Sequence, residues 1–400
     1  MTKEKSTVPR LRFPGFTDAW KQRKLGEVVS ISSGYTGDAS LSNGKYKLTR
    51  IETISDGNVD VSRTGFSNEL PDEKYRLKFG DILFSNINSL AHIGKVAIFN
   101  IGEEVFHGIN LLRLVPKQDL INPYFIYYQL VTESKKNWSK SHANQAVNQA
   151  SINQTSLSIQ KISLPTLPEQ EAIGSFFSDL DQLITLHQRK LDDVKELKKA
   201  LLQKMFPKGN GNDFPELRFP EFTDAWKQRK LGEVAVVVMG QSPDSKNYTN
   251  NPLDNILVQG NADLKNGNVE PRVWTTQITK IAEKGDIIVS VRAPVGDVAK
   301  TSYKVVLGRG VAGIKGNDFI YQTLIRMKQF GYWMKLSTGS TFESINSGDI
   351  KSSLIPLPTL PEQEAIGSFF SDLDQLITLH QRQLDHLKLL KKALLQQMFI

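Results

Sequence analysis

Cysteine is missing from all 400 residues of the sequence. Its absence excludes disulfides, thiolate nucleophiles, cysteine zinc sites and iron–sulfur clusters, and fits a reducing compartment. Long apolar runs are missing too: the longest, Val234–Met239, is far shorter than the roughly 20 residues of a membrane-spanning helix. No apolar stretch typical of a secretory signal follows Met1–Lys5. We therefore expect a cytoplasmic protein with no membrane partner.

The motifs of common catalytic sites are also missing. The sequence contains no G-x-x-x-x-G-K-[ST] phosphate loop, no G-x-G-x-x-G and no H-E-x-x-H. Asn122–Phe125 resembles the N-P-P-[YF] loop of amino-methyltransferases but lacks its second proline, and Pro71–Lys74 has the letters of a nuclease motif without the spacing. We expect no catalytic residue, no metal ligand and no cofactor on this chain.

Charge and length set broad limits on the class of protein. Lys and Arg number 50 against 42 Asp and Glu, a net charge of +8, which is compatible with binding a polyanion. Many cytosolic proteins reach such an excess without a nucleic-acid partner. A chain of 400 residues is too long for one ordinary core and suggests two to three domains.

The chain is a tandem duplication with constant ends. Leu11–Val28 recurs with one substitution as Leu217–Val234, and Leu164–Arg189 recurs unchanged as Leu357–Arg382. Internal repeats determine architecture, so each half is expected to fold as one copy of the same design. Identical ends indicate a shared task for the two copies.

The segments between these blocks have diverged. They still align through Gly80–Ser85 and Gly285–Ser290, and they mix β-rich runs with Gly, Asn and Ser turns. Tyr124–Leu130 and Ile320–Trp333 are predicted as short helices. The pattern predicts a mixed α/β domain in each half, and the divergence predicts two different tasks of one kind.

The second constant block predicts a long helix over residues 169–206, repeated as Glu362–Phe399. Apolar residues recur every seven positions, with Thr166 and Glu169 read as a capping box at the start. A 38-residue helix is about 57 Å long, so we expect the two copies to pair as an antiparallel coiled coil. The alternative is a core helix folded on its own domain, although core helices seldom exceed about 25 residues.

The apolar stripe of these helices is wider than one coiled-coil seam. The seam histidines, His187 and His380, are interpreted as packed side chains rather than ligands. A second apolar face predicts a further partner protein. Its members are predicted partner-binding residues: Phe176, Leu183, Leu186, Leu197, Phe369, Leu376, Leu379 and Leu390.

Amide-rich loops at 141–154 and 337–347 are the candidates for recognition of bases. Asn and Gln pair with adenine in the major groove, and Arg pairs with guanine. The ordinary alternative is that Asn, Gln, Ser and Gly simply make loops polar. Turns present Arg292 and Arg309, for which we assign Asn86, Asn88 and His107 as first-half counterparts. The predicted DNA contacts are Tyr35, Asn86, Asn88, His107, Asn144, Gln145, Asn148, Gln241, Ser242, Arg292, Arg309, Ser340, Thr341 and Ser344.

The doubled blocks resemble the specificity subunit of type I restriction–modification systems. The resemblance rests on Leu-Pro-x-Leu-Pro-Glu-Gln-x-Ala-Ile at 164–173 and 357–366, and on Phe-x-x-x-Trp…Lys-Leu-Gly-Glu-Val at 16–28 and 222–234. It implies two target-recognition domains that read the halves of a bipartite double-stranded DNA site. It also implies two modification subunits carrying S-adenosylmethionine, and two restriction subunits using ATP and Mg.

The implied fold is α/β (α+β), with two pseudo-symmetric recognition domains separated by two long antiparallel helices. The expected boundaries are 1–163 and 211–356 for the recognition domains, and 164–210 and 357–400 for the helices that set the gap and dock partners. Four residues inserted after Arg189 should then shift the unread gap of the site. Two alternatives are a stand-alone bipartite DNA-binding protein and a single-chain nuclease or methyltransferase, which the missing motifs argue against.

Overall fold

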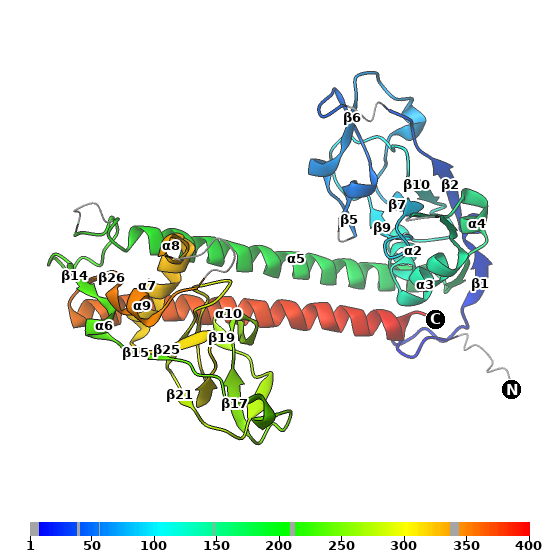
Figure 1. Ribbon diagram of the computed structural model, residues 1–400. Helices are drawn as coiled ribbons and strands as arrows, with labels where there is room; N and C mark the ends of the chain where they lie inside the picture. The colour runs from blue at the N-terminus through cyan, green and yellow to red at the C-terminus, as the bar shows by residue number, and fades with distance from the viewer. Residues whose placement is uncertain (1–7, 38–40, 56, 147–148, 209–212, 337–343) are drawn as a thin grey trace. The chain divides into compact units, whose positions relative to one another are not determined.

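The chain divides into two compact units, each built from two separate stretches of sequence. The computed structural model describes residues 8–37, 41–55, 57–146, 149–208, 213–336 and 344–400 (Figure 1). Unit 1 comprises Met1–His187 with Leu384–Ile400, and unit 2 comprises Gln188–Gln383. The long helices were expected to form regions separate from the recognition domains. Instead, each helix has one segment in unit 1 and the other in unit 2.

Both units are built on a six-stranded sheet with the same strand order. Antiparallel pairing predominates, with one parallel pair in each sheet, β5–β9 in unit 1 and β19–β23 in unit 2. The unit 1 sheet runs in the order β2 (Val29–Ser33), β10 (Leu112–Pro116), β7 (Ile82–Phe84), β9 (Val96–Ile98), β5 (Asn58–Val59) and β4 (Ile54–Ser55). The unit 2 sheet runs in the order β15 (Val236–Met239), β25 (Val311–Lys315), β22 (Ile287–Ser290), β23 (Val298–Lys300), β19 (Asn268–Val269) and β18 (Leu264–Lys265).

The remaining strands differ between the units. In unit 1, β3 (Tyr46–Leu48) pairs with β6 (Gly65–Ser67). In unit 2 a five-stranded sheet runs in the order β16 (Tyr248–Thr249), β20 (Val273–Thr275), β17 (Asn255–Val258), β24 (Val305–Leu307) and β21 (Lys280–Ala282). The mixed α/β class predicted from the sequence is confirmed, and the divergence of the two middles is visible in these added strands.

The constant opening block forms the same two-stranded ribbon in each unit, with the strand of the block exposed and its partner strand mostly covered. In unit 1, β1 (Lys21–Lys24) pairs with β13 (Lys161–Leu164), and the single-turn helix α1 (Leu25–Val28) follows. In unit 2 the equivalents are β14 (Lys227–Lys230), β26 (Leu354–Leu357) and α6 (Leu231–Val234). The start and end of each half thus meet in one two-stranded sheet.

The predicted short helices are present. Tyr124–Leu130 lies within α2 (Pro123–Leu130), and Ile320–Trp333 is divided between α7 (Asp318–Gln329) and α8 (Tyr332–Leu336). Gly331 adopts a φ of 69°, a left-handed conformation that ends α7. The remaining helices are α3 (Glu133–His142), α4 (Gln154–Ser158) and α9 (Ser347–Ser352).

The two long helices begin two residues before the predicted starts. They are α5 (Leu167–Lys204) and α10 (Leu360–Met398), of 38 and 39 residues. Their segments run antiparallel within each unit, as predicted. In unit 1 the ring centroids of Phe177 and Phe399 are 6.0 Å apart, while Lys391 Nζ lies 2.5 Å from Asp181 Oδ1.

Unit 2 repeats this arrangement with the opposite ends of the helices. Lys198 Nζ, near the end of α5, lies 2.5 Å from Asp374 Oδ1, in the first half of α10. Lys198 and Asp374 occupy the repeat positions of Lys391 and Asp181. The same cross-helix ion pair therefore closes both units.

Equivalent aromatic cores hold the helices to the sheets. In unit 1 the Trp20 and Phe125 centroids are 5.6 Å apart, and the terminal Phe399 packs against both rings. In unit 2 the Trp226 and Phe319 centroids are also 5.6 Å apart, and Phe206 packs against both. The end of one helix therefore completes the core at the start of the other.

Glu169, in the first turn of α5, binds Arg12 and Trp20. Its fully buried carboxylate accepts hydrogen bonds from Arg12 Nε at 2.6 Å and Nη2 at 2.7 Å, and from Trp20 Nε1 at 3.4 Å. The bond to Glu169 raises the pKa of Arg12 above its usual value. This carboxylate joins the opening block to the first turn of the long helix.

Unit 2 contains the same carboxylate latch. Glu362 accepts from Arg218 Nε at 2.7 Å and Nη2 at 2.8 Å, and from Trp226 Nε1 at 3.2 Å. The neighbouring glutamine of the Pro-Glu-Gln motif holds the N-terminus of the domain helix in both units: Gln170 accepts from Asn122 N, and Gln363 accepts from Asn317 Nδ2, both at 3.0 Å. The repeated motif is therefore a structural joint.

Candidate nucleic-acid interface

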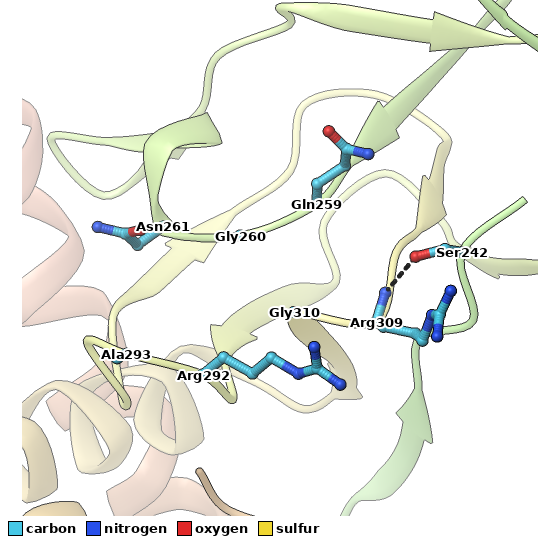
Figure 2. Close-up of a pocket in the computed structure, with 8 residues that line it drawn as sticks. All are labelled: Ser242, Gln259, Gly260, Asn261, Arg292, Ala293, Arg309 and Gly310. Carbon is cyan, nitrogen blue, oxygen red and sulfur yellow. Dashed lines mark hydrogen bonds between the residues drawn. The ribbon is translucent and has the colours of Figure 1, made fainter. Parts of the chain in front are cut away.

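A polar hollow of about 610 Å³ opens among the loops of unit 2. Four separate loops contribute to it, and Figure 2 shows their side chains. The hollow brings together Ser242, Arg292 and Arg309, three predicted DNA contacts from segments far apart in the chain. Its lining is Ser242, Gln259, Gly260, Asn261, Arg292, Ala293, Arg309 and Gly310.

Short backbone contacts fix the loops around the hollow. The Arg309 N–H donates to Ser242 Oγ at 3.1 Å (Figure 2). The Val291 N–H donates to the Gly310 carbonyl oxygen at 2.9 Å, so the loop of Arg292 is attached to the loop of Arg309. A Cβ at position 310 would lie 2.0 Å from the Gln259 carbonyl oxygen, and only glycine allows this approach.

The two arginines supply most of the chemistry of the hollow. Both side chains are exposed, and Figure 2 shows Arg292 extending from its loop toward the loop of Arg309. A guanidinium is a planar fork of five donors that fits guanine O6 and N7 or a phosphate. Gln259 and Asn261, both half-buried, add amides that can donate and accept. The hollow is therefore suited to the polar edge of a base or to the DNA backbone.

Sequence reasoning missed Gln259 and Asn261. They follow the buried end of β17 and flank Gly260, and that pattern of strand, amide, glycine and amide was the available signal. They reach the hollow only because β17 pairs with β24, the strand that leads into the Arg309 turn. That pairing joins segments far apart in sequence.

In unit 1 the amide-rich loop forms a three-stranded ribbon. Strand β11 (Asn144–Ala146) pairs with β12 (Gln149–Ser151), which pairs with β8 (Ile87–Asn88). The side chains of Asn144 and Gln145 are exposed on the outer strand and are free to meet a partner surface. The ribbon therefore presents these two amides from regular backbone.

Two other predicted amides of unit 1 make internal bonds. Asn86 Nδ2 donates to the Ile152 carbonyl oxygen at 3.3 Å, and Asn88 Nδ2 donates to Ser85 Oγ at 3.1 Å. Tyr35 is half-buried, with its ring centroid 5.5 Å from that of Tyr75. Asn86 and Asn88 are both half-buried, and the Asn86 Oδ1 atom is buried without a hydrogen-bond partner among the described residues.

His107 does not fit its predicted role in DNA contact. Its side chain is 1% exposed, and Nε2 donates to the Leu111 carbonyl oxygen at 2.9 Å. Its assignment as the counterpart of Arg309 is also wrong. In unit 1 the Tyr35 N–H donates to the His107 carbonyl oxygen, and in unit 2 the Gln241 N–H donates to the Leu307 carbonyl oxygen. His107 is therefore equivalent to Leu307, which is also buried.

The remaining predicted contacts divide into two groups. Ser344 is exposed and forms a β-bridge with Arg292. Gln241 is also exposed and lies two residues after the end of β15. Asn148, Ser340 and Thr341 lie outside the described residues.

Leucines on the long helices form an exposed row in both copies. Leu186 is 47% exposed and its repeat equivalent Leu379 is 51% exposed. The two predicted phenylalanines differ, because each is half-buried and packs edge-on against a ring of the opening block: Phe176 on Phe13 at 5.6 Å, and Phe369 on Phe219 at 6.0 Å. The exposed members are Leu183, Leu186, Leu197, Leu376, Leu379 and Leu390.

Two other kinds of site are absent from the described residues. No group of three or more His, Asp or Glu side chains is placed to hold a metal ion in that part of the chain. Within the same residues, no helix combines the length and apolarity needed to cross a membrane.

A duplicated frame that carries two unlike sets of polar loops is typical of a protein that recognises two DNA segments, and the comparisons define the class. The family model for the type I restriction modification DNA specificity domain matches residues 17–196 and 223–389. The chain therefore belongs to this family, and its role is DNA sequence specificity in type I restriction–modification.

Individual relatives agree with the family model. The putative type I restriction enzyme MjaX specificity subunit of Methanocaldococcus jannaschii is 38% identical over 393 residues, covering 94% of this chain and 92% of the relative. The MjaVIII specificity subunit of the same organism is 22% identical over 316 residues, covering 74% and 73%.

Solved structures show the same fold. The S subunit of a type I restriction–modification system from M. genitalium has a TM-score of 0.70 at 16% identity, covering 98% of this chain and 99% of that one. A chain from a structural study of the assembly and conformational transition of the type I R-M system has a TM-score of 0.54 at 21% identity, covering 96% and 98%.

Buried His107 predicts a loss of unit 1 stability in acid. Burial lowers the pKa of His107 to about 4, with Arg113 contributing in the same direction. Between about pH 6.5 and pH 4 the unfolded chain binds a proton that the folded chain rejects, so stability falls as pH falls, by about 3 kcal/mol at pH 4. His107→Leu places in unit 1 the residue that unit 2 has at position 307, and it should remove this pH dependence of the free energy of unfolding. Chemical denaturation of both proteins from pH 4 to 7 measures it, and equal pH slopes would contradict it.

Proposed function

We propose that unit 1 and unit 2 each read one half of a bipartite duplex site. The observation that carries this proposal is the contrast between the loops: unit 2 presents two exposed arginines in a hollow, and the same strand framework in unit 1 presents an amide ribbon. Contacts to base edges specify the sequence that is read, whereas contacts to phosphates position the protein on the duplex. Two unlike loop sets on one framework therefore suit two different half-sites.

The long helices would set the unread gap between the half-sites. Each is a continuous helix with segments in both units, and the cross-helix ion pairs Lys391–Asp181 and Lys198–Asp374 fix the register within each unit. A helix rises 1.5 Å per residue and B-DNA rises 3.4 Å per base pair along each strand. Helix length would therefore translate directly into gap length.

The same helices would dock the catalytic subunits. The row of exposed leucines occurs twice with identical sequence around Leu186 and Leu379, and two copies of one surface suit two copies of one modification subunit. In this proposal the chain itself is non-catalytic and works in the cytoplasm. S-adenosylmethionine is bound by the modification subunits, and ATP and Mg by two restriction subunits. The alternative of a stand-alone DNA-binding protein is not favoured by the family.

Lengthening both helices by one turn should lengthen the gap. We expect four residues inserted after Arg189 and four after its repeat equivalent, Arg382, to add about 6 Å, close to two base pairs, without changing the bases read. The measurement is mapping of N6-methyladenine after co-expression with the modification subunit in a host free of adenine methylation.

The matched control keeps the helix length. Alanine substitutions at the exposed α5 positions Arg189, Asp192, Asp193 and Glu196 should leave the gap unchanged. An unchanged gap with altered half-sites in the insertion variant would contradict the proposed role of the helices.

Charge on the leucine row should weaken docking without unfolding the chain. We expect Leu186→Glu with Leu379→Glu to reduce affinity for the modification subunit at least about tenfold, because an unpaired carboxylate is costly to bury in an interface. Both positions are exposed, so the free energy of unfolding should change by less than about 0.5 kcal/mol. Leu253→Glu, at a position 91% exposed in the α/β part of unit 2, is the control. Titration calorimetry decides, and wild-type affinity in the double variant would refute the assignment.

A further inference from the structure

Strand register gives the true counterpart of Arg292. In unit 1 the Ile152 N–H donates to the Asn86 carbonyl oxygen, and Ile87 pairs with Ser151. In unit 2 the Ile345 N–H donates to the Val291 carbonyl oxygen, and Arg292 forms a bridge with Ser344. Because these contacts superimpose residue by residue, Arg292 occupies the position of Ile87.

The counterpart of Arg309 follows in the same way. Leu112 pairs with Ser33 and Phe84 in unit 1, as Ala312 pairs with Met239 and Val289 in unit 2. Positions 112 and 312 are therefore equivalent, as are 107 and 307. Arg309 then corresponds to Ile109, an isoleucine that is 47% exposed in a tight turn.

A third position beside these two changes in the same sense. The backbone bonds that equate His107 with Leu307 also equate Tyr35 with Gln241. Unit 2 therefore presents Gln241, Arg292 and Arg309 where unit 1 presents Tyr35, Ile87 and Ile109. At these three equivalent points unit 2 carries three hydrogen-bonding side chains, and unit 1 carries two isoleucines and a tyrosine.

Three of these side chains, Arg292, Arg309 and Ile109, are exposed, whereas Ile87 is half-buried in β8 and Tyr35 packs against Tyr75. Arg292 and Arg309 are exposed, and neither forms an ion pair with any acidic side chain among the described residues. Ile109 leaves nearly half of its surface in water, although an isoleucine in a turn gains nothing from exposure. Residues that the fold does not need at equivalent points are placed to meet a ligand.

Resting on the proposed function, we propose that positions 292 and 309 and their equivalents 87 and 109 determine which bases the two half-sites contain. Arg292 and Arg309 select guanine through bidentate bonds to O6 and N7. Ile87 and Ile109 select thymine through apolar contact with its 5-methyl group, the feature that distinguishes thymine in the major groove. Gln259 and Asn261 supply further amide contacts beside the arginines.

Arginine-to-lysine variants test the guanine contacts, because lysine keeps the charge and loses the fork. We expect R292K and R309K each to lower discrimination roughly tenfold at one G·C pair of one half-site, with the other half-site and the gap unchanged. The full chain is co-expressed with its modification subunit, and methylated motifs are mapped. R272K, at an exposed arginine outside the hollow, is the control and should keep the wild-type motif.

The outcomes separate this inference from the function on which it rests. If the wild-type complex methylates no bipartite motif, the proposed function fails. If it does, but R292K and R309K keep that motif, or lose only overall efficiency, the arginines contact phosphates or nothing, and the inference is overturned. It is equally overturned if R272K relaxes the motif as much as R292K and R309K do.

Loss of the thymine methyl group tests the isoleucines. Duplexes in which deoxyuridine replaces each thymidine of the other half-site in turn are titrated with the assembled complex. We expect about fourfold weaker binding at one or two positions, the effect of one buried methyl group. The Ile87→Ala, Ile109→Ala double variant should bind the thymidine and the deoxyuridine duplexes with equal affinity. A wild-type complex indifferent to every methyl group of that half-site would overturn the assignment.

Discussion

A buried carboxylate at the start of each long helix is the joint on which both units depend. Glu169 and Glu362 are each fully buried, and each is matched by two guanidinium N–H groups and an indole N–H from the opening block. A buried charge is costly unless it is paired and hydrogen-bonded, so the opening block, helix and glutamate must assemble together. The residues of this joint are the ones that the two halves share.

Because the residues of the joint are the same in both halves, the loops between the opening block and the long helix are free to differ. The six-stranded sheet keeps one strand order in both units, while the added strands and the residues at equivalent loop positions diverge. A rigid framework with variable loops is the usual way for recognition to change without loss of fold. Arg309 and Ile109 lie in equivalent turns of the two units, which equivalent backbone hydrogen bonds hold. One side chain is a charged hydrogen-bond donor and the other is apolar.

Much of this was readable from the sequence, and the failures have physical causes. Repetition and seven-residue periodicity predicted the long helices, and the turn contexts of Arg292 and Arg309 predicted two residues that share a hollow. Pairing the halves by residue type failed in the loops: Asn86 and Asn88 were assigned to Arg292, whereas the strand register places Ile87 there. The prediction for His107 was wrong because burial depends on tertiary packing, which local sequence does not reveal.

Hydrogen exchange, measured by mass spectrometry on Glu169→Gln and Glu362→Gln variants, tests the joint most directly. Removing one charge from a buried pair costs about 3 kcal/mol, enough to open the attached segments. We expect faster exchange in residues 11–24 and 384–398 for Glu169→Gln, and in residues 188–204 and 217–230 for Glu362→Gln. Each variant is the control for the other. The role of the joint would be contradicted if, in either variant, hydrogen exchange became faster by the same factor in residues 360–383 and in residues 384–398.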